Sequence, residues 1–522
     1  MPTPVYIAGA ALTPFGRAEV SLVELLARAA GEALSQAGLD EVEAVYLGVM
    51  NPEEFTGEGN LAVALADRLG LGGAASSRVE TASSTGAGAL ETAFFAVASG
   101  YRDSALVVAG EKMTGLPTRT ITRILAEVIA PSERRYGASM PALAALVTVA
   151  YAEAAGIDLG LLKEALCRVA VKNHARGALN PLAQFRKPIT PEKYQGSRMV
   201  ADPLCLYDCA PITDGAAAVV LSSRRGEVRI AGIGHATDSA EVTRRGRLVG
   251  FNSTRRAAMQ AYAMAQVNPE QVDFAEVHDA FTTFEIMGAE DLGLFPEGMG
   301  WRAVLEGRGE VGGDIPINPS GGLKARGHPV GASGLAQVVE ACWLLTGRVE
   351  AARRLPREPK VALTQSIGGL GNNNLVTILV PATRALREVG PWQAHYAPVI
   401  SPPAPAPPEA PPVRIGGRVS AATLLRTPPE GFSAPLGLAL VRTRGGWSTL
   451  AHFRGEVPPP PGTAVRLELG EDGLYRLQPV TGDVRRPLLE ARRLLRRLSR
   501  PLRRPRRSSA PPAEDPSPAE GA

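Results

Sequence analysis

The stretch PVGASGLAQVVEACWLLTG (residues 329–347) repeats, in altered form, the pattern of STGAGALETAFFAVASG (residues 84–100). Each has a turn rich in Gly and Ala, followed by an amphipathic helical pattern that ends at Gly. Apolar β-like runs recur in the same order, with VYIAG (5–9) matching VRIAG (228–232) and ALVVAG (105–110) matching VALTQS (361–366). Two copies of a β/α unit of roughly 200 residues predict a pseudo-symmetric, layered α/β body.

The composition is that of a multidomain globular protein. A chain of 522 residues corresponds to about two to four folding units, and 45% hydrophobic with 21% charged residues excludes a wholly disordered or fibrous protein. No apolar run approaches the roughly 20 residues that span a bilayer, and the first residues lack a secretory pattern, so we expect a cytoplasmic protein. The four cysteines predict no disulfide framework, and Cys205 with Cys209 is too little for a zinc site, so we expect no metal.

The charge is unevenly distributed along the chain. Residues 115–200 carry twelve Lys or Arg against six Asp or Glu. This basic excess suits a polyanionic small molecule better than nucleic acid, which requires a broad basic face, and a solvated charged surface is the alternative. Residues 485–507 hold eleven Arg against one Glu. For this tail we favour a solvated basic segment over binding to a membrane surface.

Breaks in composition divide the chain into units. Seven of the twelve residues of SPPAPAPPEAPP (401–412) are Pro, which is typical of a stiff linker. After it, Val413 to Val480 alternates apolar and polar residues between Gly and Pro turns, which predicts about five short strands in a small β-barrel that folds separately. The predicted units are 1–114 (first half), 115–225 (an insertion running into the end of that half), 226–383 (second half), 384–412 (linker), 413–480 (barrel) and 481–522 (tail).

The repeat also indicates where the chemistry belongs. Ser83 in TASSTGAG and His328 in GHPVGASG precede equivalent predicted helices, where free backbone N–H groups and the helix dipole stabilise an anion. A hydroxyl and an imidazole at such positions suit acyl transfer. Two further motifs join them: EVHDAFT (276–282), which offers His278, and the Gly-rich QSIGGLGNNN (365–374), whose N–H groups can approach a carbonyl oxygen. Taken singly, each motif is more often a helix cap or a turn.

These motifs, in this order, resemble the thiolase superfamily, in particular its sterol carrier protein X-type and archaeal, acetyl-CoA acetyltransferase-like branch. The resemblance covers Pro4 to about Pro381 and includes GEKMT (110–114) and NPSGGLKARGHPVGASG (318–334). It implies a thiolase fold of two similar βαβ halves in αβαβα layers, a homodimer or higher oligomer, and coenzyme A thioesters as substrates with no permanently bound cofactor. The basic region 115–200 would then cover the phosphates of coenzyme A.

The resemblance also implies roles for single residues. His328 matches the histidine that activates the nucleophile, and His278 matches a histidine that orients a water in an oxyanion hole. The N–H groups of Ser83 and Gly368 would form a second hole. Thiolases carry the acyl group on a Cys where this chain has Ser83, and their second, acid/base Cys is replaced too. Because a Ser hydroxyl needs its base in the transition state and an oxyester is a poorer electrophile, we expect ordinary thiolysis to be impaired.

The segment after the linker resembles the OB-fold half of small acyl-CoA-associated proteins that accompany thiolase-type subunits. Residues 413–480 hold no Cys, so the zinc ribbon of those proteins is absent, and the segment offers too few aromatic and basic residues for nucleic acid: Phe432, Trp447, Phe453 and Tyr475. Three functions stay open: a thiolase-type acyl-CoA enzyme that transfers an acyl group or makes or breaks a carbon–carbon bond, a thiolase-like retro-aldolase without a covalent intermediate, and a non-catalytic acyl-CoA-binding scaffold. The two histidines favour an enzyme.

Overall fold

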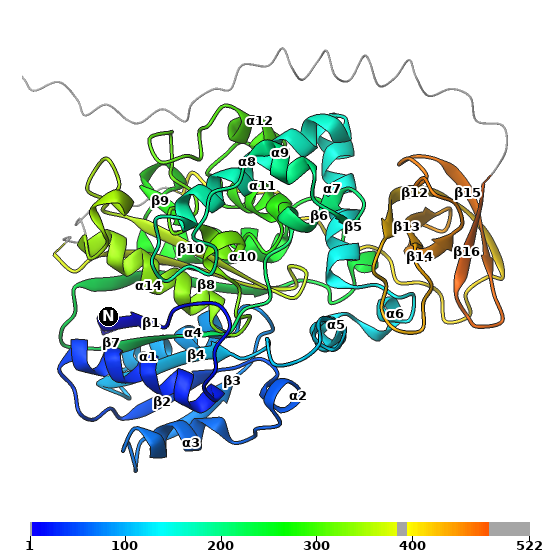
Figure 1. The fold of residues 1–522 in the computed structure, drawn as a ribbon. Helices are drawn as coiled ribbons and strands as arrows, with labels where there is room; N and C mark the ends of the chain where they lie inside the picture. The colour runs from blue at the N-terminus through cyan, green and yellow to red at the C-terminus, as the bar shows by residue number, and fades with distance from the viewer. Residues whose placement is uncertain (1–2, 384–393, 480–522) are drawn as a thin grey trace, which may run out of the picture.

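The computed structural model describes residues 3–383 and 394–479, which form two β-sheets and the helices that cover them (Figure 1). The larger sheet has nine strands in the order β3-β2-β4-β7-β1-β8-β11-β10-β9. Outward from its centre, β1, β7, β4 and β2 correspond to β8, β11, β10 and β9: in both series the last pair is parallel and the others are antiparallel. This confirms the predicted duplication.

Six elements of the two halves correspond to the predicted runs: β1, α4, β4, β8, α14 and β10. The first half contains β1 (Tyr6–Leu12), α1 (Leu22–Ala37), β2 (Ala44–Gly48), α2 (Pro52–Thr56), α3 (Leu61–Arg68), β3 (Ala75–Val79), α4 (Thr85–Ala98), β4 (Ser104–Glu111) and, after the insertion, β7 (Gly215–Ser222). The second half contains β8 (Val228–Thr237), α10 (Asn252–Ala265), β9 (Phe274–Glu276), α11 (Thr282–Asp291), α12 (Gly300–Leu305), α13 (Gly322–Arg326), α14 (Ser333–Thr346), β10 (Ala362–Gly368) and β11 (Asn373–Pro381). Short 3-10 turns are η1 (Ala126–Val128), η2 (Leu206–Asp208), η3 (Val242–Arg244), η4 (Pro269–Gln271) and η5 (Ala351–Arg353).

The two repeats meet at the centre of the sheet. The strands predicted from VYIAG and VRIAG pair with each other, Tyr6 opposite Arg229 and Ile7 opposite Val228. Helices α4 and α14 contact each other and share one apolar core with strands of both halves. The outer face of the first half is covered by α1 and α3, and that of the second half by α10. The layers are therefore α, β, α, β, α, as the thiolase resemblance implied, with α4 and α14 at the middle.

The insertion forms a mainly helical region beside this body, shown in cyan in Figure 1. It consists of α5 (Thr118–Leu125), α6 (Pro131–Arg134), α7 (Met140–Ala155), α8 (Leu159–Gly177), α9 (Pro191–Gln195), β5 (Met199–Ala201) and β6 (Leu204–Cys205). In the described ranges no single helix is long and apolar enough to cross a membrane. Only the pair α7 and α8, bent by 118°, passes that test by length and composition together.

The C-terminal segment forms the predicted five-stranded barrel. Its strands are β12 (Arg414–Leu425), β13 (Leu436–Thr443), β14 (Ser448–Phe453), β15 (Ala464–Leu469) and β16 (Tyr475–Pro479). They run β12-β13-β14-β16-β15 and close back on β12, with β14 and β16 parallel, which is an OB-like arrangement. Trp447, Phe453 and Tyr475 are buried in its core, and Phe432 packs towards the insertion. None of these aromatic rings is therefore free to stack on a base.

The barrel packs against the insertion, and its predicted separate folding stays a prediction. The short strand β5 of the insertion pairs with β12, opposite Leu425, and Thr423 Oγ1 donates to Asp202 O at 2.7 Å. Apolar residues of β12, β13 and β14 share one core with α7. A small barrel buries little apolar surface by itself. Its apolar outer face is removed from water by packing against α7.

The described part of the Pro-rich stretch also lies against the body. Asn252 Nδ2 donates to Ser401 O at 3.0 Å, and Ala404 N donates to Arg244 O at 2.8 Å. The linker therefore follows the second half and does not act as a free spacer. The prediction for the Arg-rich tail, and the first part of the predicted linker at 384–393, lie outside the described residues.

Candidate functional site

Four predicted motifs converge where α4 and α14 begin. The two helix starts are so close that a Cβ at Gly86 would lie 2.7 Å from Gly331 O. Gly368, at the end of β10, lies against the turn that carries Ser83, and a Cβ there would come within 2.4 Å of Thr81 O. These positions admit only Gly because two backbones meet there. The structure thus brings the Ser83, His328 and Gly368 segments together.

His328 is oriented by Ser333. Its Nδ1 lies 2.6 Å from Ser333 Oγ, and Ser333 Oγ lies 2.9 Å from Pro329 O, which it reaches as a donor. With the single Ser333 proton on that carbonyl, Nδ1 of His328 is the donor to Ser333 and Nε2 presents its lone pair. Burial, with the charge of Arg326, lowers the pKa of His328 to about 3. The imidazole is therefore neutral at pH 7 and able to accept a proton.

His278 lies beside His328. The two rings are edge to face, with centroids 5.3 Å apart and planes at 90°. His278 is 2% exposed, and burial first, then His328 and Arg326, hold its pKa well below the usual value. Two neutral imidazoles thus lie side by side. Gln365, the first residue of the QSIGGLGNNN motif, accepts the backbone N–H of His278 through its side-chain Oε1 at 3.3 Å.

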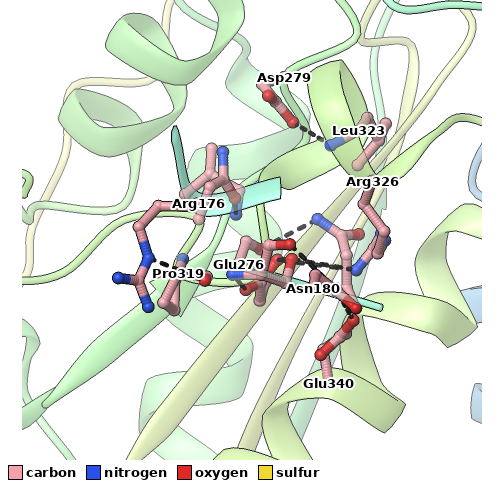
Figure 2. A network of polar contacts seen from close by, with 12 residues as sticks. Arg176, Asn180, Glu276, Asp279, Pro319, Leu323, Arg326 and Glu340 are labelled. Atoms are coloured by element: carbon pink, nitrogen blue, oxygen red, sulfur yellow. Dashed lines mark hydrogen bonds and ion pairs between the residues drawn. The ribbon is translucent and has the colours of Figure 1, made fainter. Parts of the chain in front are cut away.

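A buried polar network fixes the segment that carries His328 (Figure 2). Glu276 accepts Ser320 N at 3.0 Å and Ser320 Oγ at 2.7 Å, and it lies 3.7 Å from Arg326. Asn180 of the insertion donates to Ser320 O and to Glu340. Glu276 belongs to the motif of His278 and Ser320 to that of His328, so the network holds the two motifs in register.

A second carboxylate makes the same connection. Asp279, one residue after His278, accepts Leu323 N at 2.6 Å and Asn173 Nδ2 at 2.7 Å. Burial and the nearby Glu285 raise the pKa of Asp279 to about 7. Asp279 therefore holds the start of α13 in place through Leu323 N and Lys324 N. The EVHDAFT motif did not predict this structural role.

Ser83 lies two residues before α4, half-buried. Its neighbour Ser84, at the N-cap position, does not cap the helix with its side chain, because its hydroxyl donates to Thr81 O and Asn373 O. No side chain therefore caps the start of α4, where Thr85 N donates to Ala82 O at 3.0 Å and Ala87 N donates to Ser84 O at 2.9 Å. Within the described part of the chain the Ser83 hydroxyl has no hydrogen-bond partner, so the predicted direct pairing with His328 is not formed here.

Sequence reasoning missed one buried acid at the site's edge. Glu111, from GEKMT, accepts Met50 N at 2.9 Å and Gly331 N at 3.2 Å. Burial raises the pKa of Glu111 to about 8. It thereby links the end of β2 to the turn between His328 and α14. Its signal in the sequence was a lone charge at the end of an apolar strand.

Part of the basic excess of 115–200 has internal partners. Lys172 pairs with the buried Glu285 at 2.8 Å, Arg168 pairs with Glu310 at 2.6 Å, and Arg135 donates to a barrel carbonyl. Several other cations of the region are exposed: Arg119, Arg134, Arg186, Lys187, Lys193 and Arg198. The end of the insertion reaches the site directly, since Ile212 forms an isolated bridge with His328 and Cys209 with Phe281. No group of three or more His, Cys, Asp or Glu within residues 3–383 and 394–479 is arranged to hold a metal ion.

Comparisons with known proteins agree with this geometry. The family model for the thiolase N-terminal domain matches residues 5–225, and that for the thiolase C-terminal domain-like family matches residues 234–381. The chain is 37% identical over 386 residues to acetyl-CoA acetyltransferase of Methanothermobacter thermautotrophicus, a match covering 72% of this chain and 98% of the relative. It is 33% identical over 395 residues to sterol carrier protein 2 of Bos taurus, over 72% of each chain. A solved Ltp2–ChsH2(DUF35) aldolase superposes with a TM-score of 0.63 at 24% identity, covering 74% of this chain and 99% of that one.

Proposed function

Since the chain belongs to the thiolase superfamily, we propose that it is an acyl-CoA enzyme of acyltransferase type that makes or breaks a carbon–carbon bond next to a coenzyme A thioester. One observation carries this proposal: His328 is neutral, with Nδ1–H committed to Ser333 and Nε2 left as a base. A neutral imidazole has the free lone pair that removal of a proton α to a thioester requires. A scaffold that only bound acyl-CoA would not need this arrangement.

In the covalent version Ser83 takes the place of the thiolase Cys. Its Oγ attacks the thioester carbonyl as Nε2 of His328 accepts the hydroxyl proton, and the C–S bond breaks. The coenzyme leaves as the thiol with that proton, and Ser83 holds an oxyester. A second acyl-CoA then loses an α proton to a histidine, and its carbanion attacks the oxyester. Ser83 leaves as the hydroxyl after taking the proton back, and the N–H groups of Ser83 and Gly368 face the transient oxyanion.

A retro-aldolase is the second candidate, favoured by the Ser83 hydroxyl, which has no base within hydrogen-bond distance in the described residues. Likeness to an aldolase fold is consistent with it. In this version a histidine removes the proton of a β-hydroxyl on the acyl chain, and the Cα–Cβ bond breaks to release a carbonyl compound. The thioester enolate is then protonated, and Ser83 only fills the site.

Intact-mass spectrometry separates the two versions. The full chain is incubated with acetyl-CoA, butyryl-CoA and octanoyl-CoA, and the adduct is mapped by peptide digestion. The covalent version predicts one acyl mass on the peptide of Ser83, lost together with turnover in Ser83→Ala and retained in Ser77→Ala, an exposed serine of β3. An unmodified chain whose Ser83→Ala variant stays active would establish the aldolase version. Absence of binding to every ester would contradict an acyl-CoA function altogether.

The remaining predictions concern the oligomeric state, the cellular location, the partners and the binding of coenzyme A phosphates. We propose a homodimer or larger oligomer in the cytoplasm, working with other acyl-CoA proteins, with coenzyme A phosphates held by the exposed cations of 115–200. Size-exclusion chromatography with light scattering and salt-dependent calorimetry with coenzyme A measure the first and last of these.

A further inference from the structure

A cavity of about 280 Å³ lies where the barrel meets the body. Helix α7 forms one wall, and the segment 242–249, between β8 and α10, forms another. The barrel closes the third side with Ser420, Arg442 and Ser448. The cavity is formed between the body and the docked barrel, because residues of both line it.

The cavity is lined by more positive than negative charge. Three arginines line it, Arg245, Arg247 and Arg442, against the single carboxylate of Glu153. Arg247 is already paired with Glu297. Arg442 is exposed on β13 and has no ion pair in the described part of the chain.

Arg245 is the decisive residue. It is 5% exposed, and its Nε and Nη2 have no hydrogen-bond partner. Asp238 and Glu133 act on it only through longer-range charge, and Glu133 is itself engaged by Thr243 N at 2.8 Å. A buried guanidinium with two unused donor atoms is costly unless an acceptor fills the adjoining space.

Arg245 also connects the cavity to the reaction site. Its Nη1 donates to Leu370 O at 2.6 Å. Leu370 belongs to the turn between β10 and β11 that follows Gly368, which in turn contacts the Ser83 segment. Arg245 is therefore connected to the segment of Ser83 through the turn between β10 and β11.

We propose that this cavity is an oxyanion-binding site in which Arg245 from the body and Arg442 from the barrel hold a carboxylate or phosphate of the substrate. Guanidinium groups bind both anions through paired N–H donors. The carboxylate would sit at the far end of the acyl chain, and the phosphate would belong to coenzyme A. Both sources rest on the proposed function, whereas binding of an oxyanion by the two guanidinium groups does not.

Calorimetry on the full chain tests the site with three probes. Adenosine 3′,5′-bisphosphate supplies phosphates on adenosine without an acyl chain, and glutaryl-CoA and pentanoyl-CoA have five-carbon acyl chains that differ only in the terminal carboxylate. The variant is Arg442→Gln, and the matched control is Arg466→Gln, an exposed arginine on β15 away from the cavity. Arg245→Lys is a second variant, because it keeps the charge and loses the paired donors.

A carboxylate site predicts that wild type binds glutaryl-CoA more tightly than pentanoyl-CoA, and that Arg442→Gln removes this preference through about tenfold weaker binding of glutaryl-CoA alone. A phosphate site predicts about tenfold weaker binding of the bisphosphate and of both esters in Arg442→Gln. The site is disproved if Arg442→Gln and Arg245→Lys bind all three probes as Arg466→Gln does. If no ester binds but the bisphosphate binds in an Arg442-dependent way, the site stands and the acyl-CoA function fails.

Discussion

The starts of α4 and α14 occupy equivalent places in the two halves, yet they are built differently. Before α14, His328 is oriented by Ser333, and Glu111 binds the turn that follows. Before α4, the Ser83 hydroxyl has no partner within residues 3–383 and 394–479. The difference teaches that the site orients its proton-transfer group, His328, by hydrogen bonds. It does not orient the hydroxyl of Ser83, the candidate nucleophile, in the same way.

Replacing His328 tests that contrast most severely. His328→Ala should lower kcat by about 10²- to 10⁴-fold, since a general base contributes this much. His395→Ala is the control, because His395 is exposed and far from the site in sequence. If Ser83→Ala proves as damaging as His328→Ala, as the covalent version predicts, both helix starts are catalytic and the contrast between them fails; a milder effect of Ser83→Ala supports the aldolase version.

Ser333 is the next residue to change. Ser333→Ala removes the acceptor for Nδ1–H of His328, so the tautomer with a free Nε2 is no longer selected, and kcat should fall about tenfold with little change in KM. Ser333→Thr keeps a hydroxyl and should restore most of the activity. A Ser333→Ala variant with wild-type kcat would show that the tautomer is set by something else.

Acid should weaken the fold through the buried histidines. The folded pKa of His278 lies well below its unfolded value, so between those values only the unfolded chain binds a proton, and stability is lost as the pH falls below about 6.5. The slope is up to about 1.4 kcal/mol per pH unit for each such histidine. Urea titrations at pH 7, 6 and 5 should therefore give a flatter pH dependence for His278→Gln than for wild type or His395→Gln. Equal slopes would mean that His278 titrates normally.

Glu111 should have the smallest effect and the opposite sign. Its folded pKa is raised to about 8, so the native state keeps a proton that the unfolded chain releases above about pH 4.5, and stability falls as the pH rises between these values. Glu111→Gln mimics the protonated acid and should gain about 1 kcal/mol over wild type at pH 9, with no gain at pH 5. Glu127→Gln, an exposed acid, serves as the control. A loss of stability at both pH values would show that Glu111 is bound as the anion.

Local patterns in the sequence were enough to predict the duplicated halves, the barrel and the two histidines. VYIAG and VRIAG are repeats that could be read directly, and they became the paired strands β1 and β8. The long-range partners could not be read, because Ser333 has no feature that marks it as the orienting group of His328. The same holds for the docking of the barrel, since no local pattern links Asp202 to Thr423. The linker composition even indicated the opposite, because Pro-rich sequence specifies stiffness and not whether the chain lies against a surface.

The contact between the insertion and the barrel can form only after the ribosome has made both segments. Asp202 and Thr423, which bond to each other, are separated by 221 residues. At about 5 to 20 residues per second on the ribosome, Asp202 waits roughly 10 to 45 seconds for Thr423, and the apolar face of α7, which is made earlier, waits longer for the barrel that covers it. During that interval the nascent chain exposes a surface that favours aggregation, so release of a chain truncated before residue 413 should give a species that chaperones retain.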